Sequence, residues 1–117
     1  MTQDNPAENA PYTTISAEEA RQKIEAGATL IDVRRPEEWN RGHVAQADLL
    51  TISGIYEFGK ALQDLQLAPD QEVIFMCASG QRSAMASEIA ALLGFQKVYN
   101  LENGINGWLY RGYPVER

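Results

Sequence analysis

The sequence of 117 residues is 44% hydrophobic and 22% charged, proportions that suit one soluble domain with a single buried core. Its formal net charge of -6 disfavours nucleic-acid binding, which requires a basic surface. The sequence has no apolar stretch long enough to span a membrane and no secretory signal, so it predicts a cytoplasmic protein with no membrane partner. The single cysteine excludes an internal disulfide and a cysteine-based metal site, and we expect neither a metal nor another cofactor.

The chain alternates between predicted strands and helices after a polar start. Residues 1–11 have no apolar period and are predicted to form a flexible tail, which leaves residues 12–117 as one domain. Apolar β-branched runs and helical periodicity locate the elements. The predicted strands cover residues 29–33, about 48–52, 73–76 and 97–99, and the predicted helices cover residues 17–26, a short segment from 36, roughly 55–65 and a segment from near 83 to 93.

Two of these helices carry large apolar residues at helical spacing, which predicts the faces that they bury. These residues are Ile55, Phe58, Leu62 and Leu65 in the first, and Met85, Ile89, Leu92 and Leu93 in the second. The run from Val73 to Met76 is the most continuously apolar, as expected for a central parallel strand covered on both faces. The element order therefore indicates an α/β fold with three layers, an open, mostly parallel sheet of about five strands with helices on both faces.

Cys77 follows the most apolar predicted strand directly. Ligands of open α/β sheets bind beyond the carboxyl ends of the strands, so we expect the thiol in such a site. The segment after it, Ala78, Ser79, Gly80, Gln81, Arg82, Ser83, is mostly small or polar and can turn its N–H groups inward as an anion nest. The following helix lowers the pKa of a nearby thiol through its positive N-terminal dipole, and Arg82 adds a cation. This combination suits a nucleophile that attacks a small anionic substrate, whereas the structural alternative is a thiol buried in the core.

Charged and aromatic residues elsewhere receive more modest interpretations. Asp32 ends a predicted strand at the same sheet edge as Cys77 and either orients the active loop or caps a turn. Arg34 is interpreted as a helper that steers anions, and Arg35 as a solvent-exposed residue. The remaining aromatic candidates are assigned to the core or its edge, and they are Trp39, Trp108, Tyr110 and Tyr113.

Three motifs in this order and spacing resemble the rhodanese-like family in its single-domain form. The first motif combines Asp32-Val33-Arg34, Pro36-Glu37-Glu38-Trp39 and Gly42-His43-Val44, the second is the loop from Cys77 to Ser83, and the third runs from Leu101 to Trp108 and is followed by Gly112 to Val115. The match covers the chain from about Ile15 to Val115. Asn103 replaces a glycine that is usual in the third motif, a mild change because asparagine tolerates left-handed backbone conformations.

The resemblance implies a sulfurtransferase without a cofactor. In such an enzyme Cys77 takes the outer sulfur of a small anionic donor such as thiosulfate, carries it as a persulfide, and gives it to a thiol, a protein or, in assays, cyanide. The N–H groups from Ala78 to Ser83 would hold the outer sulfur, and Arg82 would bind the oxyanion of the donor. His43 packs and forms hydrogen bonds within the fold in this family's pattern, so we assign it a structural role.

Two other functions stay open. Phosphatase relatives of the family have five residues between the cysteine and the arginine, whereas this chain has four, Ala78 to Gln81, which favours sulfur over a phosphate-sized group. An arsenate reductase would also need a resolving thiol, and Cys77 is the only cysteine. The fold also serves as a non-catalytic binding module, but such members usually lose the cysteine.

Overall fold

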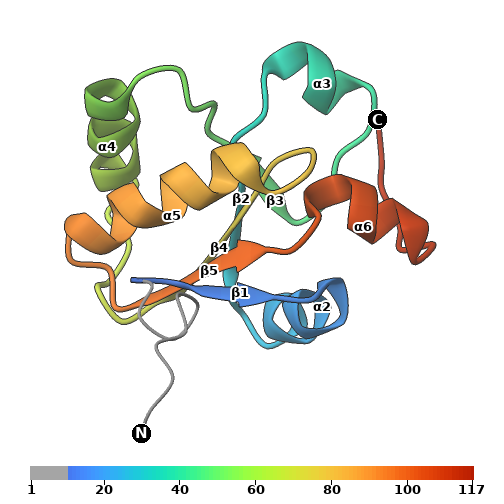
Figure 1. Ribbon diagram of the computed structural model, residues 1–117, viewed down its shortest axis with the longest axis horizontal. Coiled ribbons are helices and arrows are strands. Elements are labelled where there is room, and N and C mark those ends of the chain that lie inside the picture. The colour runs from blue at the N-terminus through green and yellow to red at the C-terminus, as the bar shows by residue number, and fades with distance from the viewer. Residues whose placement is uncertain (1–10) are drawn as a thin grey trace, which may run out of the picture.

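The computed structural model describes residues 11–117 (Figure 1), so the predicted tail of residues 1–11 lies, except for its last residue, outside the described residues. The strands are β1 (Thr13–Ile15), β2 (Thr29–Asp32), β3 (Ala47–Leu49), β4 (Glu72–Met76) and β5 (Lys97–Leu101). The helices are α2 (Ala17–Glu25), α3 (Pro36–Asn40), α4 (Ile55–Asp64), α5 (Gln81–Leu92) and α6 (Gly104–Tyr110). No helix within residues 11–117 is both long and apolar enough to cross a membrane.

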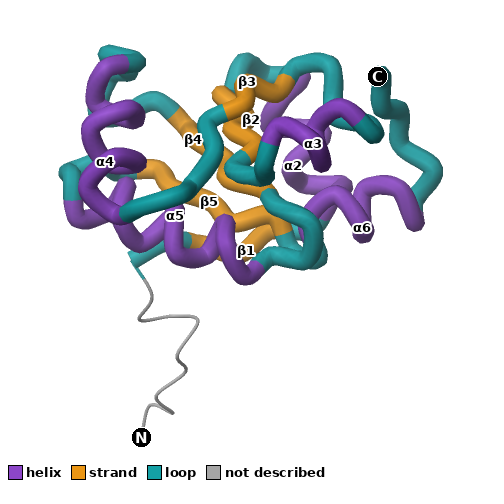
Figure 2. Tube along the Cα trace, turned by 90° about the horizontal axis from the view of Figure 1, so that it is seen from above, coloured by secondary structure: helices purple, strands orange, loops and turns teal. Residues whose placement is uncertain are grey.

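The described strands form one five-stranded sheet in the order β1-β5-β4-β2-β3, and every neighbouring pair is parallel. Helices α4 and α5 cover one face and α2 and α6 cover the other, as Figures 1 and 2 show from two directions. The predicted three-layer α/β fold is therefore confirmed, with a sheet that is wholly parallel. Strand β4 is central, and its residues Val73–Met76 are 0% exposed, as the apolar run predicts.

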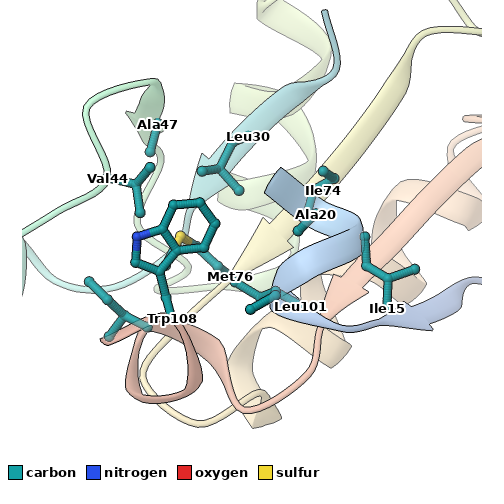
Figure 3. Packing of buried hydrophobic residues seen from close by; sticks show 11 residues of the cluster. Ile15, Ala20, Leu30, Val44, Ala47, Ile74, Met76, Leu101 and Trp108 are labelled. Atoms are coloured by element: carbon teal, nitrogen blue, oxygen red, sulfur yellow. The ribbon is translucent and has the colours of Figure 1, made fainter. Parts of the chain in front are cut away.

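The core consists of two apolar clusters separated by the sheet. Because side chains alternate along a strand, Ile74 and Met76 join the cluster under α2 and α6, while Val73 and Phe75 join the cluster under α4 and α5. Figure 3 shows the first cluster, to which both Trp108 of α6 and Met76 of β4 belong. Both faces of β4 are therefore packed, and this packing fixes the position of Cys77, the residue that follows the strand.

The faces that α4 and α5 bury differ from the predicted stripes. In α5 only Ile89 of the predicted residues is buried, and the helix turns small side chains to the sheet, namely Ser83, Ala86, Ser87 and Ala90. In α4 the residues Phe58 and Leu62 are buried as predicted, but Ile55 and Leu65 are exposed. The prediction for Met85, Leu92 and Leu93 is wrong because small residues let the α5 backbone approach the sheet closely, which leaves the large residues outside.

Two elements are absent from the sequence prediction, strand β1 and helix α6. Strand β1 has three residues and lies at the edge of the sheet, where its short polar sequence gives no strand pattern. Helix α6 contains two glycines, which disfavour a helix by propensity, and its packing overrides this preference. The predicted strand at 48–52 is also shifted, since β3 covers Ala47–Leu49.

Candidate active site

The carboxyl ends of β2 and β4 lie side by side at one edge of the sheet, where Asp32 is paired in register with Met76. The Val33 N–H extends this pairing and donates to the Met76 carbonyl O at 2.9 Å. The chain leaves β2 toward β3 on one side and leaves β4 toward β5 on the other side. The strand order therefore reverses between β2 and β4. Open α/β sheets bind ligands at such a point, and Cys77 is the first residue beyond β4.

The loop after Cys77 is shorter than the sequence indicates, because α5 begins at Gln81 rather than near Ser83. Only Ala78–Gly80 separate the cysteine from the helix. Gly80 has a φ of 106°, a left-handed conformation that glycine adopts without a steric penalty. With this turn the Gly80 N–H donates a hydrogen bond to Cys77 Sγ at 3.1 Å. The Gly80 N–H of the predicted anion nest therefore points at the sulfur.

The Ser83 hydroxyl group contacts the sulfur and connects it to the Asn100 amide. Cys77 is 1% exposed, and its Sγ lies 3.4 Å from the Ser83 Oγ. The Ser83 hydroxyl also donates to Asn100 Oδ1 at 2.6 Å, and Asn100 Nδ2 donates to the Gly80 carbonyl O at 3.2 Å. Ser83 and Asn100 are both buried. Since Ser83 has a single proton to donate, an ionised Cys77 competes with the Asn100 oxygen for it.

The environment of Cys77 favours its ionised form. Burial raises the pKa of the Cys77 thiol, because the thiolate loses its hydration there. Hydrogen bonds from the Ser83 side chain and from the backbone N–H groups of Ser83, Gly80 and Ser79 lower it. The hydrogen bonds outweigh burial, so the pKa lies below the ordinary value of a thiol. A buried thiol that is inert would show the opposite shift, and this observation favours the reactive reading of Cys77 over the structural one.

Helix α6 holds the loop from the other side. The Ile105 N–H donates to the Cys77 carbonyl O at 2.9 Å, and the Asn106 N–H donates to the Ala78 carbonyl O at 3.1 Å. A Cβ atom at Gly104 would overlap the backbone of Cys77 and Ala78, so only glycine fits. Asn103 precedes it with a φ of 60°, which confirms that asparagine supplies the left-handed conformation at this position.

Arg82 is not a free cation. Its guanidinium donates two hydrogen bonds to the Glu38 carboxylate, at 2.7 Å and 2.9 Å, and so joins α5 to α3. The hydrogen bond from Arg82 lowers the pKa of Glu38 to about 2, against the opposing effect of burial. The same pairing raises the pKa of Arg82. The active loop therefore has a fixed guanidinium beside it, oriented by a carboxylate that stays ionised.

Asp32 and Arg34 form a buried ion pair behind the loop. The Arg34 guanidinium lies 2.8 Å from the Asp32 carboxylate, and both side chains are almost fully buried. Arg34 also donates to the carbonyl oxygens of Gly42 and Glu38. Steering of anions, which the sequence suggested for Arg34, requires an exposed guanidinium and is contradicted by this burial. The pair instead braces the segment that carries Glu38, whereas Arg35 is exposed as predicted.

His43 has the structural environment that was assigned to it. Its ring stacks on Trp39 with 3.8 Å between ring centroids, and its Nδ1–H donates to the Trp39 carbonyl O. Trp108 is buried and packs edge-on against Tyr113, in agreement with the prediction for both. The prediction for Tyr110 is wrong, because 93% of this residue is exposed at the end of α6.

Sequence reasoning overlooked Glu38 and Asn100. Glu38 is 44 residues from its partner Arg82 in the chain, and such a pairing has no local pattern. Asn100 had a usable signal, since it is a polar residue between Tyr99 and Leu101, directly after the predicted strand at 97–99, and buried polar groups require partners. Within residues 11–117 no group of three or more His, Cys, Asp and Glu side chains is placed to hold a metal ion.

The assembled site can stabilise negative charge on a sulfur atom and on a ligand next to it. Cys77 Sγ has a hydroxyl group and backbone N–H groups around it, and the Arg82 guanidinium lies close enough for the Cys77 charge to raise its pKa. Such a site suits a nucleophilic thiolate that receives an anionic substrate.

Comparison with known proteins relates this site to a family. The sequence model of the family described as Rhodanese-like domain matches residues 16–110. A rhodanese-related protein of Thermoplasma volcanium is 34% identical with a TM-score of 0.76, and the match covers 90% of this chain and 98% of that one. The polysulfide-sulfur transferase homodimer of Wolinella succinogenes is 28% identical with a TM-score of 0.78, over 92% of this chain and 80% of that one. A Rhodopseudomonas palustris protein described as a possible tyrosine phosphatase is 23% identical with a TM-score of 0.73, over 99% and 98% of the two chains, and this likeness concerns the fold alone.

Proposed function

Since the chain belongs to the family of rhodanese-like domains, we propose that it is a sulfurtransferase that carries sulfane sulfur as a persulfide on Cys77. The observation that carries the proposal is the set of donors around a single buried sulfur. The Gly80 N–H lies 3.1 Å from Cys77 Sγ and the Ser83 hydroxyl lies 3.4 Å from it. These donors favour the thiolate, which is the form that attacks sulfur.

The first half of the reaction loads the sulfur. The Cys77 thiolate attacks the outer sulfur of an anionic donor such as thiosulfate, and a new S–S bond forms. The bond between that sulfur and the sulfonate breaks, and its electron pair leaves with sulfite. The outer sulfur of the persulfide then carries the negative charge, which the N–H groups from Ala78 to Ser83 stabilise.

Arg82 receives the oxyanion end of the donor in this proposal. A guanidinium has five N–H donors, and the Glu38 carboxylate accepts from two of those of Arg82. The remaining donors are available to a sulfonate group, with the guanidinium already held in orientation. Glu38 is accordingly a positioning residue, and its negative charge reduces the attraction of the site for anions in general.

The second half of the reaction unloads the sulfur. A thiophilic acceptor attacks the outer sulfur and takes it, and the Cys77 thiolate leaves with the electron pair of the broken S–S bond. Because Cys77 is the only cysteine of the sequence, the sulfur passes to another molecule and not to a second thiol of the chain. Thiols and proteins are the proposed acceptors, and cyanide serves in the assay.

Intact-protein mass spectrometry tests the proposal directly. After incubation with thiosulfate we expect a mass gain of one sulfur atom, released sulfite, and loss of the added mass on treatment with cyanide. Cys77→Ser is the matched control and should gain no mass. If the wild-type protein gains no sulfur and forms no sulfite, the chain is a non-catalytic binding module. Turnover of an aryl phosphate or of arsenate without sulfur transfer would make it a phosphatase or a reductase instead.

A further inference from the structure

A hollow of about 390 Å³ opens beside the active loop, between the first turn of α5 and the start of α4. Its apolar lining comes from Ile52, Ile55 and Met85, and Gln81 and Arg82 form its edge toward the loop. An enclosed apolar cavity of about 150 Å³ accommodates benzene, so this hollow has room for a ring or a short alkyl chain.

Two of the three apolar side chains of the hollow are exposed, while the third, Ile52, is half-buried and packs against the core cluster of this face. Ile55 is 60% exposed and Met85 is 51% exposed, although both belong to helices that pack against the sheet. The wall is held in place, because the Ile52 N–H donates to the Val33 carbonyl O at the end of β2. Two segments, residues 52–55 and the first turns of α5, therefore present apolar groups to one concave surface.

The hollow adjoins the reactive site along the first turns of α5. Met85 follows Gln81 by four residues and Arg82 by three, so all three side chains lie on neighbouring positions of the α5 surface. Ser83, which contacts the sulfur, belongs to the same turn. A molecule that places an anionic group on Arg82 can thus extend an attached apolar group toward Met85.

We propose that this hollow binds the organic group of the sulfur donor, so that the preferred donor class consists of sulfane-sulfur anions with an apolar substituent. The inference rests on the proposed sulfur transfer. An inorganic donor such as thiosulfate leaves the apolar walls in contact with water, whereas a thiosulfonate with an aryl or alkyl group covers them. The cation at the edge and the apolar wall beyond it match the two ends of such a donor.

The chemistry of such a donor balances without a further reactant. The Cys77 thiolate attacks the outer sulfur of R–SO₂–S⁻, and the new S–S bond forms the persulfide. The bond between the outer sulfur and the sulfonyl sulfur breaks, and its electron pair leaves as the sulfinate R–SO₂⁻. Arg82 faces the sulfonyl oxygens, which gain the negative charge.

The test compares benzenethiosulfonate with thiosulfate as donors for persulfide formation on Cys77. The measured quantity is the ratio of the two kcat/KM values, so that any change in the shared chemistry cancels. Met85→Gln and Ile55→Gln place polar groups on exposed positions of the hollow, and we expect each to lower the ratio about 3- to 10-fold. Leu92→Gln is the matched control, because Leu92 is an exposed apolar residue at the far end of α5, and it should leave the ratio unchanged.

The outcomes separate this inference from the proposed function. If both donors load Cys77 and neither Met85→Gln nor Ile55→Gln changes the ratio, the assignment of the hollow is wrong while the sulfur transfer stands. If no donor loads Cys77, the sulfurtransferase proposal fails and the donor class fails with it. A fall in the ratio for the two hollow variants but not for Leu92→Gln supports the inference.

Discussion

The Ser83 hydroxyl offers the sharpest test of how the fold ionises Cys77. Ser83→Ala removes one hydrogen-bond donor from the sulfur of a residue that is 1% exposed, where water is a poor replacement for the lost donor. A hydrogen bond to a charged group contributes about 1.5 to 3 kcal/mol. The Ser83 bond lies at the low end, because it is 3.4 Å long and its proton is shared with Asn100. One pKa unit corresponds to about 1.4 kcal/mol, so we expect the Cys77 pKa to rise by about one unit.

The assay is the rate of Cys77 alkylation by iodoacetamide as a function of pH, since only the thiolate reacts. Ser87→Ala is the matched control, because Ser87 is also buried in α5 and donates to the Ser83 carbonyl O without contacting the sulfur. The Ser83→Ala profile should shift to higher pH, with about tenfold slower sulfur loading below its pKa and recovery above it. An unchanged or lower pKa in Ser83→Ala would refute the assignment of the hydroxyl as a thiolate donor.

Three further variants probe other parts of the site. Asn100→Asp puts a buried carboxylate beside the Ser83 hydroxyl and should raise the Cys77 pKa by at least about one unit, measured by the same alkylation profile; a shift to lower pH would contradict this. Gly104→Ala introduces a Cβ into the backbone of the active loop and should lower the unfolding free energy by about 2 to 4 kcal/mol in urea titrations. Gly94→Ala, at a glycine that also has a positive φ but has open space around it, should cost less, and equal losses would argue against the clash. The folded pKa of Glu38 is about 2 against an ordinary 4.5, so its ion pair stabilises the fold fully above pH 4.5 and is lost as the pH falls toward 2. The loss of unfolding free energy between pH 4.5 and pH 2 should therefore be smaller in Glu38→Gln, by about 2 kcal/mol after an allowance for solvent screening. An identical loss in the two proteins would show that the ion pair does not stabilise the fold.

The central part of the fold was predictable because its signals are local. The buried strand β4 is a continuous apolar run, and helix α2, which was predicted at residues 17–26, begins with a capping box formed by Ser16 and Glu19. These features depend on a few adjacent residues and on the physics of burial and capping. The position of Cys77 beyond β4 followed from them.

The features that were not predicted depend on residues far apart in the chain. Met85 has the pattern of a buried residue, and only the close approach of α5 through its small residues places it outside. The pairing of Arg82 with Glu38 joins two helices and has no counterpart in local spacing. For that reason the sequence predicted a free cation, while the structure contains an oriented and partly neutralised one. The positions of Arg82, Glu38 and Met85 at the edge of the site therefore depend on tertiary packing, whereas the position of Cys77 follows from local sequence.

The depth of Cys77 determines which form of the protein other molecules meet. The Cys77 thiol is almost completely covered, and in the proposed reaction the added sulfur lies one S–S bond, about 2.05 Å, beyond it. A bulky thiol that reaches the added sulfur does not reach the sulfur of Cys77 beneath it. Attack on that inner atom would leave the carrier trapped as a mixed disulfide, whereas attack on the outer atom returns it to its starting state. If the chain is the sulfurtransferase that we propose, burial of the nucleophile therefore directs each acceptor to the atom that it should remove, and protects the carrier between turnovers.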